Sequence, residues 1–131
     1  MGAKMSKDNN AVNWFDISVA DMDRAKKFYE TIFEIELKPV EAMGMRMAFF
    51  PADGSSGTVG GDLVQGPMHK PSSGGTIIYL NANPDLQLVL NRVEAAGGKI
   101  NMPKTQINPE AGYMSFISDT EGNTIGLHSN E

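Results

Sequence analysis

The amino-acid sequence predicts a single α+β domain built from two similar halves. Its 131 residues suit one domain with a core of its own. Apolar residues alternate along several short segments and recur at helical spacing along two others, so both strands and helices are expected. The order strand, helix and then three strands occurs twice along the chain. A ferredoxin-like sandwich is an alternative, because element order alone does not fix topology.

The first half opens with an alternating strand that carries one irregularity. Asp21 is placed to cap a helix over Met22–Phe33, whose apolar residues form one stripe. A turn rich in glycine and serine, over residues 53–57, precedes the last strand of this half. The expected strands cover residues 12–20, 34–40, 45–50 and 58–64.

The second half repeats this order. Asn83 and Pro84 suit the start of a second helix, because asparagine caps helices and proline fits the first helical position. Gly97 and Gly98 end that helix. The next strand carries Pro103 and is expected at a sheet edge or bulge. The expected strands cover residues 76–81, 99–107, 112–118 and 124–128.

The clearest match between the halves is the segment that ends each of them. Residues 58–62 (TVGGD) align with residues 124–128 (TIGLH), so Gly60 corresponds to Gly126 and Asp62 to His128. The predicted organisation is a disordered lead-in over residues 1–10 and a domain over 11–131, with module one at 11–66 and module two at 74–130.

Composition excludes several classes of function. The chain has no cysteine, which excludes disulfides, thiolate metal sites and a cysteine nucleophile, and suits the cytoplasm. The net charge of -5 and the lack of a basic face argue against a nucleic-acid partner. No apolar run reaches the ~20 residues that span a membrane. Phosphate-loop, dinucleotide-binding and serine-nucleophile motifs are also absent.

Three segments together resemble the vicinal oxygen chelate superfamily, which includes glyoxalase I, bleomycin and fosfomycin resistance proteins and extradiol dioxygenases. They are residues 19–29 (VADMDRAKKFY), 93–99 (VEAAGGK) and 119–125 (DTEGNTI), the last similar to a D-x-x-G-N-x-(I/V) turn before the final strand. The resemblance covers residues 13–129. It implies two βαβββ modules whose curved mixed sheets enclose a cavity, and, as in binding-type members, a homodimer.

The same resemblance implies where a metal would be held. In metal-using members the ligands come from the first and last strands of each module. Those positions fall here on Trp14, Gly60, Thr76 and Gly126. None supplies a usual ligand, because tryptophan has no acceptor and glycine has no side chain. No cofactor is therefore predicted, and a divalent metal would need displaced ligands.

Positions two residues further along these strands share the same face of the sheet. They are Asp16, Asp62, Ile78 and His128. Two carboxylates and an imidazole suit proton transfer or a displaced metal site, with Asp16 and His128 as the catalytic candidates. The structural alternatives are a carboxylate bound to loop amides, a solvated aspartate near a turn and a strand-end histidine. His69, in the loop between the halves, is expected to be solvated.

Apolar and aromatic side chains are expected to line the cavity. Trp14, the single tryptophan, is suited to stacking on a planar ligand. Arg46 is the cation inside a predicted strand, and is either an outward-facing residue or an anchor for an anionic group. The predicted ligand-binding residues are Trp14, Met47, Phe49, Asp62, Tyr79, Met114 and Phe116.

The leading hypothesis from the sequence is a protein that binds a small organic molecule without metal. One alternative is a metal-dependent lyase, isomerase or dioxygenase that uses displaced ligands. The other is a non-catalytic structural or regulatory dimer whose cavity is filled by its own side chains. Fold alone does not decide among them, because one fold hosts many functions.

Overall fold

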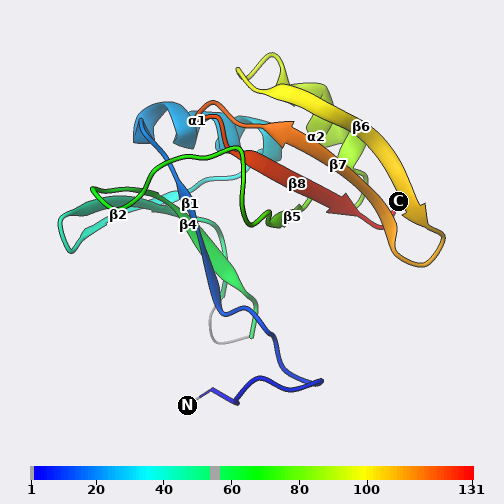
Figure 1. The fold of residues 1–131 in the computed structure, drawn as a ribbon, viewed down its shortest axis with the longest axis horizontal. Coiled ribbons are helices and arrows are strands. Elements are labelled where there is room, and N and C mark those ends of the chain that lie inside the picture. The colour runs from blue at the N-terminus through cyan, green and yellow to red at the C-terminus, as the bar shows by residue number, and fades with distance from the viewer. Residues whose placement is uncertain (1, 54–56) are drawn as a thin grey trace.

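The computed structural model describes residues 2–53 and 57–131 (Figure 1). The predicted turn therefore lies partly outside the described residues, as does Met1 of the lead-in. Module one contains β1 (Trp14–Ser18), α1 (Met22–Phe33), β2 (Lys38–Ala42), β3 (Met45–Phe49) and β4 (Gly60–Gln65). Module two contains β5 (Tyr79–Asn81), α2 (Leu86–Val93), β6 (Lys99–Asn108), β7 (Gly112–Ser118) and β8 (Thr124–Ser129). This order confirms the predicted α+β class with two βαβββ modules.

Each module forms one four-stranded sheet, and the two sheets have the same strand order. Sheet one has the order β1-β4-β3-β2, and sheet two the order β5-β8-β7-β6. The first and last strands of each module are parallel neighbours, and the other pairs are antiparallel. β6 is an edge strand with register shifts on both sides of Pro103, which agrees with the constraint that proline cannot donate to a ladder.

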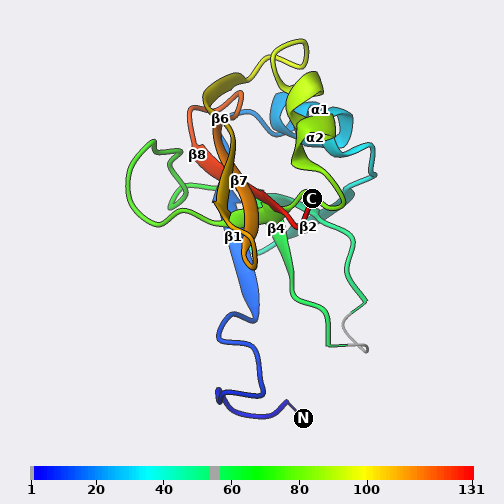
Figure 2. The same cartoon turned by 90° about the vertical axis from the view of Figure 1, so that its right-hand side faces the viewer.

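The core lies between the two helices and one face of each sheet. α1 and α2 pack side by side, as Figure 2 shows, and their apolar stripes contact both sheets. Ile17, Ala48 and Leu63 of sheet one and Leu127 of sheet two belong to this core. Because side chains alternate along a strand, the neighbouring residues point to the opposite side, which we call the open face of each sheet.

Both a local cap and tertiary contacts stabilise α1. Asp21 caps the helix as predicted, with its carboxylate accepting from the Arg24 backbone N–H at 3.1 Å. Phe28 and Tyr29 are fully buried against the sheets. Each such side chain contributes roughly 1.5–3 kcal/mol of hydrophobic stabilisation. No helix among residues 2–53 and 57–131 is long and apolar enough to cross a membrane.

The turn before β8 joins the modules through Glu121. Its carboxylate accepts from the Arg24 guanidinium at 2.8 Å and from the backbone N–H groups of Ala20 and Asp21 at 2.9 Å each. The Glu121 side chain is fully buried. Despite the opposing effect of burial, these donors lower the pKa of Glu121 to about 2. The acidic residue of the turn thus holds the start of α1 from the other module.

The same turn makes a second set of contacts with module one. The Tyr29 hydroxyl donates to Asp119 Oδ2 at 2.6 Å, and burial raises the pKa of this phenol well above its usual value. Asn123 Nδ2 donates to the carbonyl of Ser18 at 2.8 Å. The motif that resembles a family signature is therefore an inter-module hydrogen-bonding turn.

Several predicted boundaries are wrong. The strand expected over residues 76–81 is shorter, since β5 begins at Tyr79. The second helix begins at Leu86, because Asp85, not Asn83, is its N-cap and accepts from the Gln87 N–H at 2.9 Å. β2 begins four residues after Glu34, which ends α1 in a left-handed conformation with φ 54°.

Candidate functional site

Strand pairing locates in space the ligand positions that the resemblance implies. On sheet one Trp14 pairs with Gly60 and Asp16 with Asp62. On sheet two Tyr79 pairs with Gly126 and Asn81 with His128. The assignment of Thr76 and Ile78 is therefore corrected: both precede β5, and Tyr79 and Asn81 occupy the equivalent places. The match between the ends of the two modules is confirmed.

An aromatic ring lies over a glycine at both ligand positions. A Cβ atom on Gly60 would lie 3.1 Å from Trp14 Cζ3 and 2.9 Å from Ala52 Cβ. A Cβ on Gly126 would lie 2.5 Å from Tyr79 Cδ2. The glycines are needed because the rings, together with Ala52 beside Gly60, occupy the space in which a side chain would begin. The donor set that a metal needs at these positions is missing, so the residues there do not fit one.

Asp62 is the most unusual polar residue of the open face of sheet one. It lies on β4, a central strand, and is only 2% exposed, which overturns the expectation of a solvated residue. Its Oδ1 atom has no hydrogen-bond partner. Burial, hydrogen bonding to Asp16 and the charge of Asp16 raise the pKa of Asp62 to about 7, while hydrogen bonding to Trp14 acts the other way. Near pH 7 Asp62 is therefore protonated in about half of the molecules, and its proton is shared with Asp16 through the hydrogen bond.

A third ionisable group reaches this pair from the loop between the modules. His69 Nε2 lies 3.6 Å from Asp16 Oδ2. The histidine side chain is 21% exposed, so the expectation of a solvated loop residue was wrong. Its Nδ1 atom is buried without a hydrogen-bond partner. Sequence reasoning missed this contact, because nothing local fixes which strand a loop residue meets.

His128 takes no part in this group. It lies on β8 of sheet two, beside Asn81 and Met114, and its Nε2 atom is 2.6 Å from the carbonyl oxygen of Ala111. The expected grouping of Asp16 and Asp62 with His128 is thus not formed within the chain. Within residues 2–53 and 57–131, no three histidine, aspartate or glutamate side chains are grouped to hold a metal ion.

The predicted apolar lining divides between the two sheets. Trp14 packs edge-on against Phe49, with ring centroids 5.0 Å apart. Tyr79 lies beside Phe116, with centroids 5.9 Å apart. Met47 shares the open face of sheet one, and Met114 shares that of sheet two. The expected single cavity is therefore represented by two separate aromatic surfaces, one on each module.

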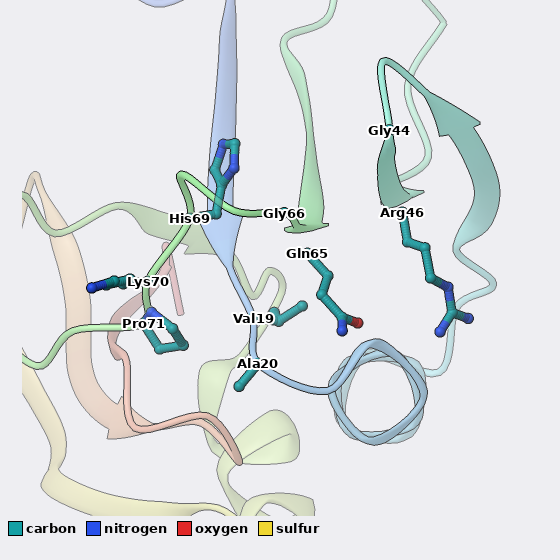
Figure 3. Close-up of a pocket in the computed structure, with 9 residues that line it drawn as sticks. All are labelled: Val19, Ala20, Gly44, Arg46, Gln65, Gly66, His69, Lys70 and Pro71. Atoms are coloured by element: carbon teal, nitrogen blue, oxygen red, sulfur yellow. The ribbon is translucent and has the colours of Figure 1, made fainter.

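Two hollows lie beside some of these residues: His69 lines the first, and Gly60 and Tyr79 line the second. A recess of about 510 Å³ lies between the loop that carries His69 and the start of α1 (Figure 3). Arg46 borders it on the helix side of sheet one, where its guanidinium pairs with Asp23 at 3.0 Å. A larger apolar groove of about 1180 Å³ runs between the modules, past Phe15, Phe50 and Ile78.

A family model connects this geometry with known proteins. The model described as the Glyoxalase/Bleomycin resistance protein/Dioxygenase superfamily matches residues 11–127. The chain belongs to this superfamily. The CFP32 proteins of Mycobacterium bovis and Mycobacterium tuberculosis, provisionally named glyoxylases, are 31% identical over 118 residues. That match covers 88% of this chain and 44% of theirs, so the chain spans less than half the length of these relatives.

Solved structures of the superfamily have the same fold. The E144Q mutant of glyoxalase I from Zea mays gives a TM-score of 0.69 at 19% identity, and covers 91% of this chain and 44% of its own. A glyoxalase/bleomycin resistance protein from Albidiferax ferrireducens gives 0.64 at 18% identity, and covers 90% of this chain and 98% of its own. At these identities the likeness shows the superfamily fold alone.

Proposed function

We propose that this superfamily member binds a small organic molecule on the open faces of its sheets and does so without a metal ion. The observation that carries the proposal is the ring over a glycine at both ligand positions, Trp14 over Gly60 and Tyr79 over Gly126. These positions offer flat aromatic surface where metal-using members offer donor atoms. The chemistry of the site is then stacking and hydrogen bonding.

The exposure of the two rings supports a binding role. Trp14 is 44% exposed and Tyr79 is 49% exposed, although both lie on sheet strands. Large aromatic side chains bury well against planar ligands, and exposed apolar surface of this kind is typical of binding sites. Each ring is also braced from the side, by Phe49 and Phe116 respectively.

A homodimer is part of the proposal. The open faces of one chain form two separate surfaces, and a symmetric pair would supply the second wall of a cavity. Size-exclusion chromatography with light scattering would test this. A monomer at micromolar concentration would contradict it. The cytoplasmic location stays a prediction.

The function is tested by two titrations of the EDTA-treated protein. Trp14 fluorescence is followed while planar aromatic molecules are added, and the melting temperature is followed with Ni, Zn, Mn, Fe(II) and Mg. We expect saturable quenching and no metal-specific rise in melting temperature. Tyr79→Ala and Phe49→Ala should weaken binding, whereas Met43→Ala, at an exposed position between β2 and β3, should not.

Two results would overturn the proposal. A rise in melting temperature with one metal, lost in Asp62→Asn, would establish the metal-dependent alternative. The lack of any saturable ligand, with a stable dimer, would favour a structural or regulatory dimer.

A further inference from the structure

One oxygen of the buried Asp62 carboxyl group lacks a hydrogen-bond partner. Its Oδ1 atom is buried without a hydrogen bond, in a side chain that is 2% exposed. A buried polar atom without a partner destabilises a fold, and an aliphatic residue would suit this central strand better. The Oδ1 atom lies on the same face as Trp14 and Asp16, which is the open face of sheet one.

The groups that face Asp62 supply no matching cation. From β1 the neighbour is Asp16, a second acid. From β3 the paired residue is Phe49, and the charged residue of that strand, Arg46, points to the helix side and pairs with Asp23. From the loop, His69 approaches Asp16 at 3.6 Å rather than Asp62. Two carboxyl groups on directly paired positions repel each other unless a proton or a cation lies between them.

The aromatic surface beside the pair also favours a cation. Trp14 precedes Asp16 by two residues on the same strand, so the two side chains share the open face. The faces of tryptophan and phenylalanine rings attract ammonium and guanidinium groups. A protonated nitrogen here would contact aromatic rings and two carboxyl oxygens at once.

We propose that the ligand carries a protonated nitrogen, an amine or an amidine, on a planar or apolar body, and that Asp62 and Asp16 bind this group while Trp14 stacks on the body. This inference rests on the proposed small-molecule function and adds the chemical class of the ligand. The raised pKa of Asp62 is consistent with it, because a cation replaces the shared proton. Binding of the cation then releases that proton to the buffer.

The experiment compares matched ligand pairs by calorimetry and Trp14 quenching. The pairs are phenethylamine with 2-phenylethanol, benzamidine with benzamide, and 2-naphthylmethylamine with 2-naphthalenemethanol. In the natural protein each cation should bind about tenfold more tightly than its neutral partner, as charged hydrogen bonds require. The heat of cation binding at pH 7 should also vary with the ionisation enthalpy of the buffer.

The matched variants are Asp62→Asn, Asp16→Asn and Glu41→Gln. The first two should reduce the preference for the cation to about twofold or less and abolish proton release. Glu41 is exposed on β2, where it is the strand partner of Arg46 on the helix side of the sheet. Its substitution is the control for the loss of one negative charge away from the site. The Glu41→Gln variant should keep the natural preference.

The outcomes separate the inference from the function. Equal binding of cations and their neutral partners, or a preference that survives in Asp62→Asn, would overturn cation recognition and leave the small-molecule function standing. Failure of every probe to bind, charged or neutral, would count against the proposed function itself and the inference would fall with it.

Discussion

The open faces of the two sheets share a backbone plan and differ in chemistry. Both place an aromatic ring over a glycine at the first pair of the parallel ladder. At the next pair on the same face, sheet one has Asp16 beside Asp62, and sheet two has Asn81 beside His128. His128 contacts the carbonyl oxygen of Ala111, whereas Asp62 Oδ1 has no partner. The polar residue of sheet two is hydrogen-bonded, whereas one carboxyl oxygen of Asp62 on sheet one is not.

This difference shows how a repeated module can specialise. The parallel ladder and its glycine occur in both modules, because the backbone geometry and the packing of the ring require them there. The side chains two residues further along are free to diverge, because they face away from the common core. Ser115 of sheet two also has a buried hydroxyl without a partner, but it pairs with the core residue Leu127, whereas the unpartnered oxygen of Asp62 lies on an open face.

The largest expected contrast is in the pH dependence of stability. Asp62 has a pKa of about 7 in the folded protein, against an ordinary value of 3.8. The folded chain therefore holds this proton more tightly than the unfolded chain, and the stabilisation present at low pH is lost as pH rises through about 7. From pH 5 to pH 8 the free energy of unfolding should fall by about 3 kcal/mol from this group.

Urea unfolding at the two pH values measures the effect. Asp62→Asn should remove most of the fall, and His128→Asn should keep it. If the free energy of unfolding of Asp62→Asn fell with pH as steeply as that of the unmodified protein, the titrating group would be a residue other than Asp62.

A second prediction concerns the turn that joins the modules. Glu121→Gln should lower the free energy of unfolding at pH 7 by about 2–3 kcal/mol, because a buried charged acceptor of five hydrogen bonds is lost. The pKa of Glu121 is lowered to about 2. Its stabilisation is therefore complete above about pH 4.5 and is lost as pH falls through 2.

Hydrogen exchange decides whether the sheets respond together. We expect strands of both sheets to lose protection to a similar extent in Glu121→Gln. Loss of protection confined to sheet two would show that the modules open separately. The two sheets would then differ in local stability as well as in the chemistry of their open faces.

A third prediction compares the two glycines. Gly126→Ala should destabilise by about 2 kcal/mol, since the new Cβ would lie 2.5 Å from the Tyr79 ring. Gly60→Ala should cost about 1 kcal/mol, since the new Cβ would lie 2.9 Å from Ala52 Cβ and 3.1 Å from the nearest ring atom of Trp14. Thermal melts of the two variants are sufficient. Equal losses would indicate that both rings move aside with the same ease.

The smallest effect is expected from the rings themselves. Phe49→Leu and Phe116→Leu should each cost about 0.5–1.5 kcal/mol, the contribution of one aromatic pair. Only Phe49→Leu should shift the emission of Trp14. A shift of equal size from Phe116→Leu would mean that the two open faces meet, across the proposed dimer or, contrary to the separation described, within one chain.

The sequence predicted elements whose signals are local. The helix Met22–Phe33 has the predicted bounds, because the Asp21 cap and the apolar stripe agree. The correspondence of Gly60 with Gly126 follows from the repeat and is confirmed by the ladders. Residues 76–78 were misassigned, because an extended apolar segment has the same pattern whether or not a neighbour pairs with it.

The composition of the candidate site could be predicted only in part, because it depends on tertiary contacts that no local sequence pattern indicates. Register placed Asp16 beside Asp62 correctly once the repeat was aligned. His128 was grouped with them because both sheets were expected to close on one cavity, but its strand belongs to the other sheet. His69 reaches Asp16 through a loop path that only the packed structure defines.

The ring over each glycine also restricts how the protein can change over generations. A metal donor at residue 60 or 126 would need a side chain in space that Trp14 or Tyr79 now fills. The aromatic residue would have to be replaced by a smaller one and the glycine by a larger one. Replacing the glycine first would destabilise the fold, because the new side chain would clash with the ring. A metal donor at either residue would therefore need two linked substitutions on its sheet.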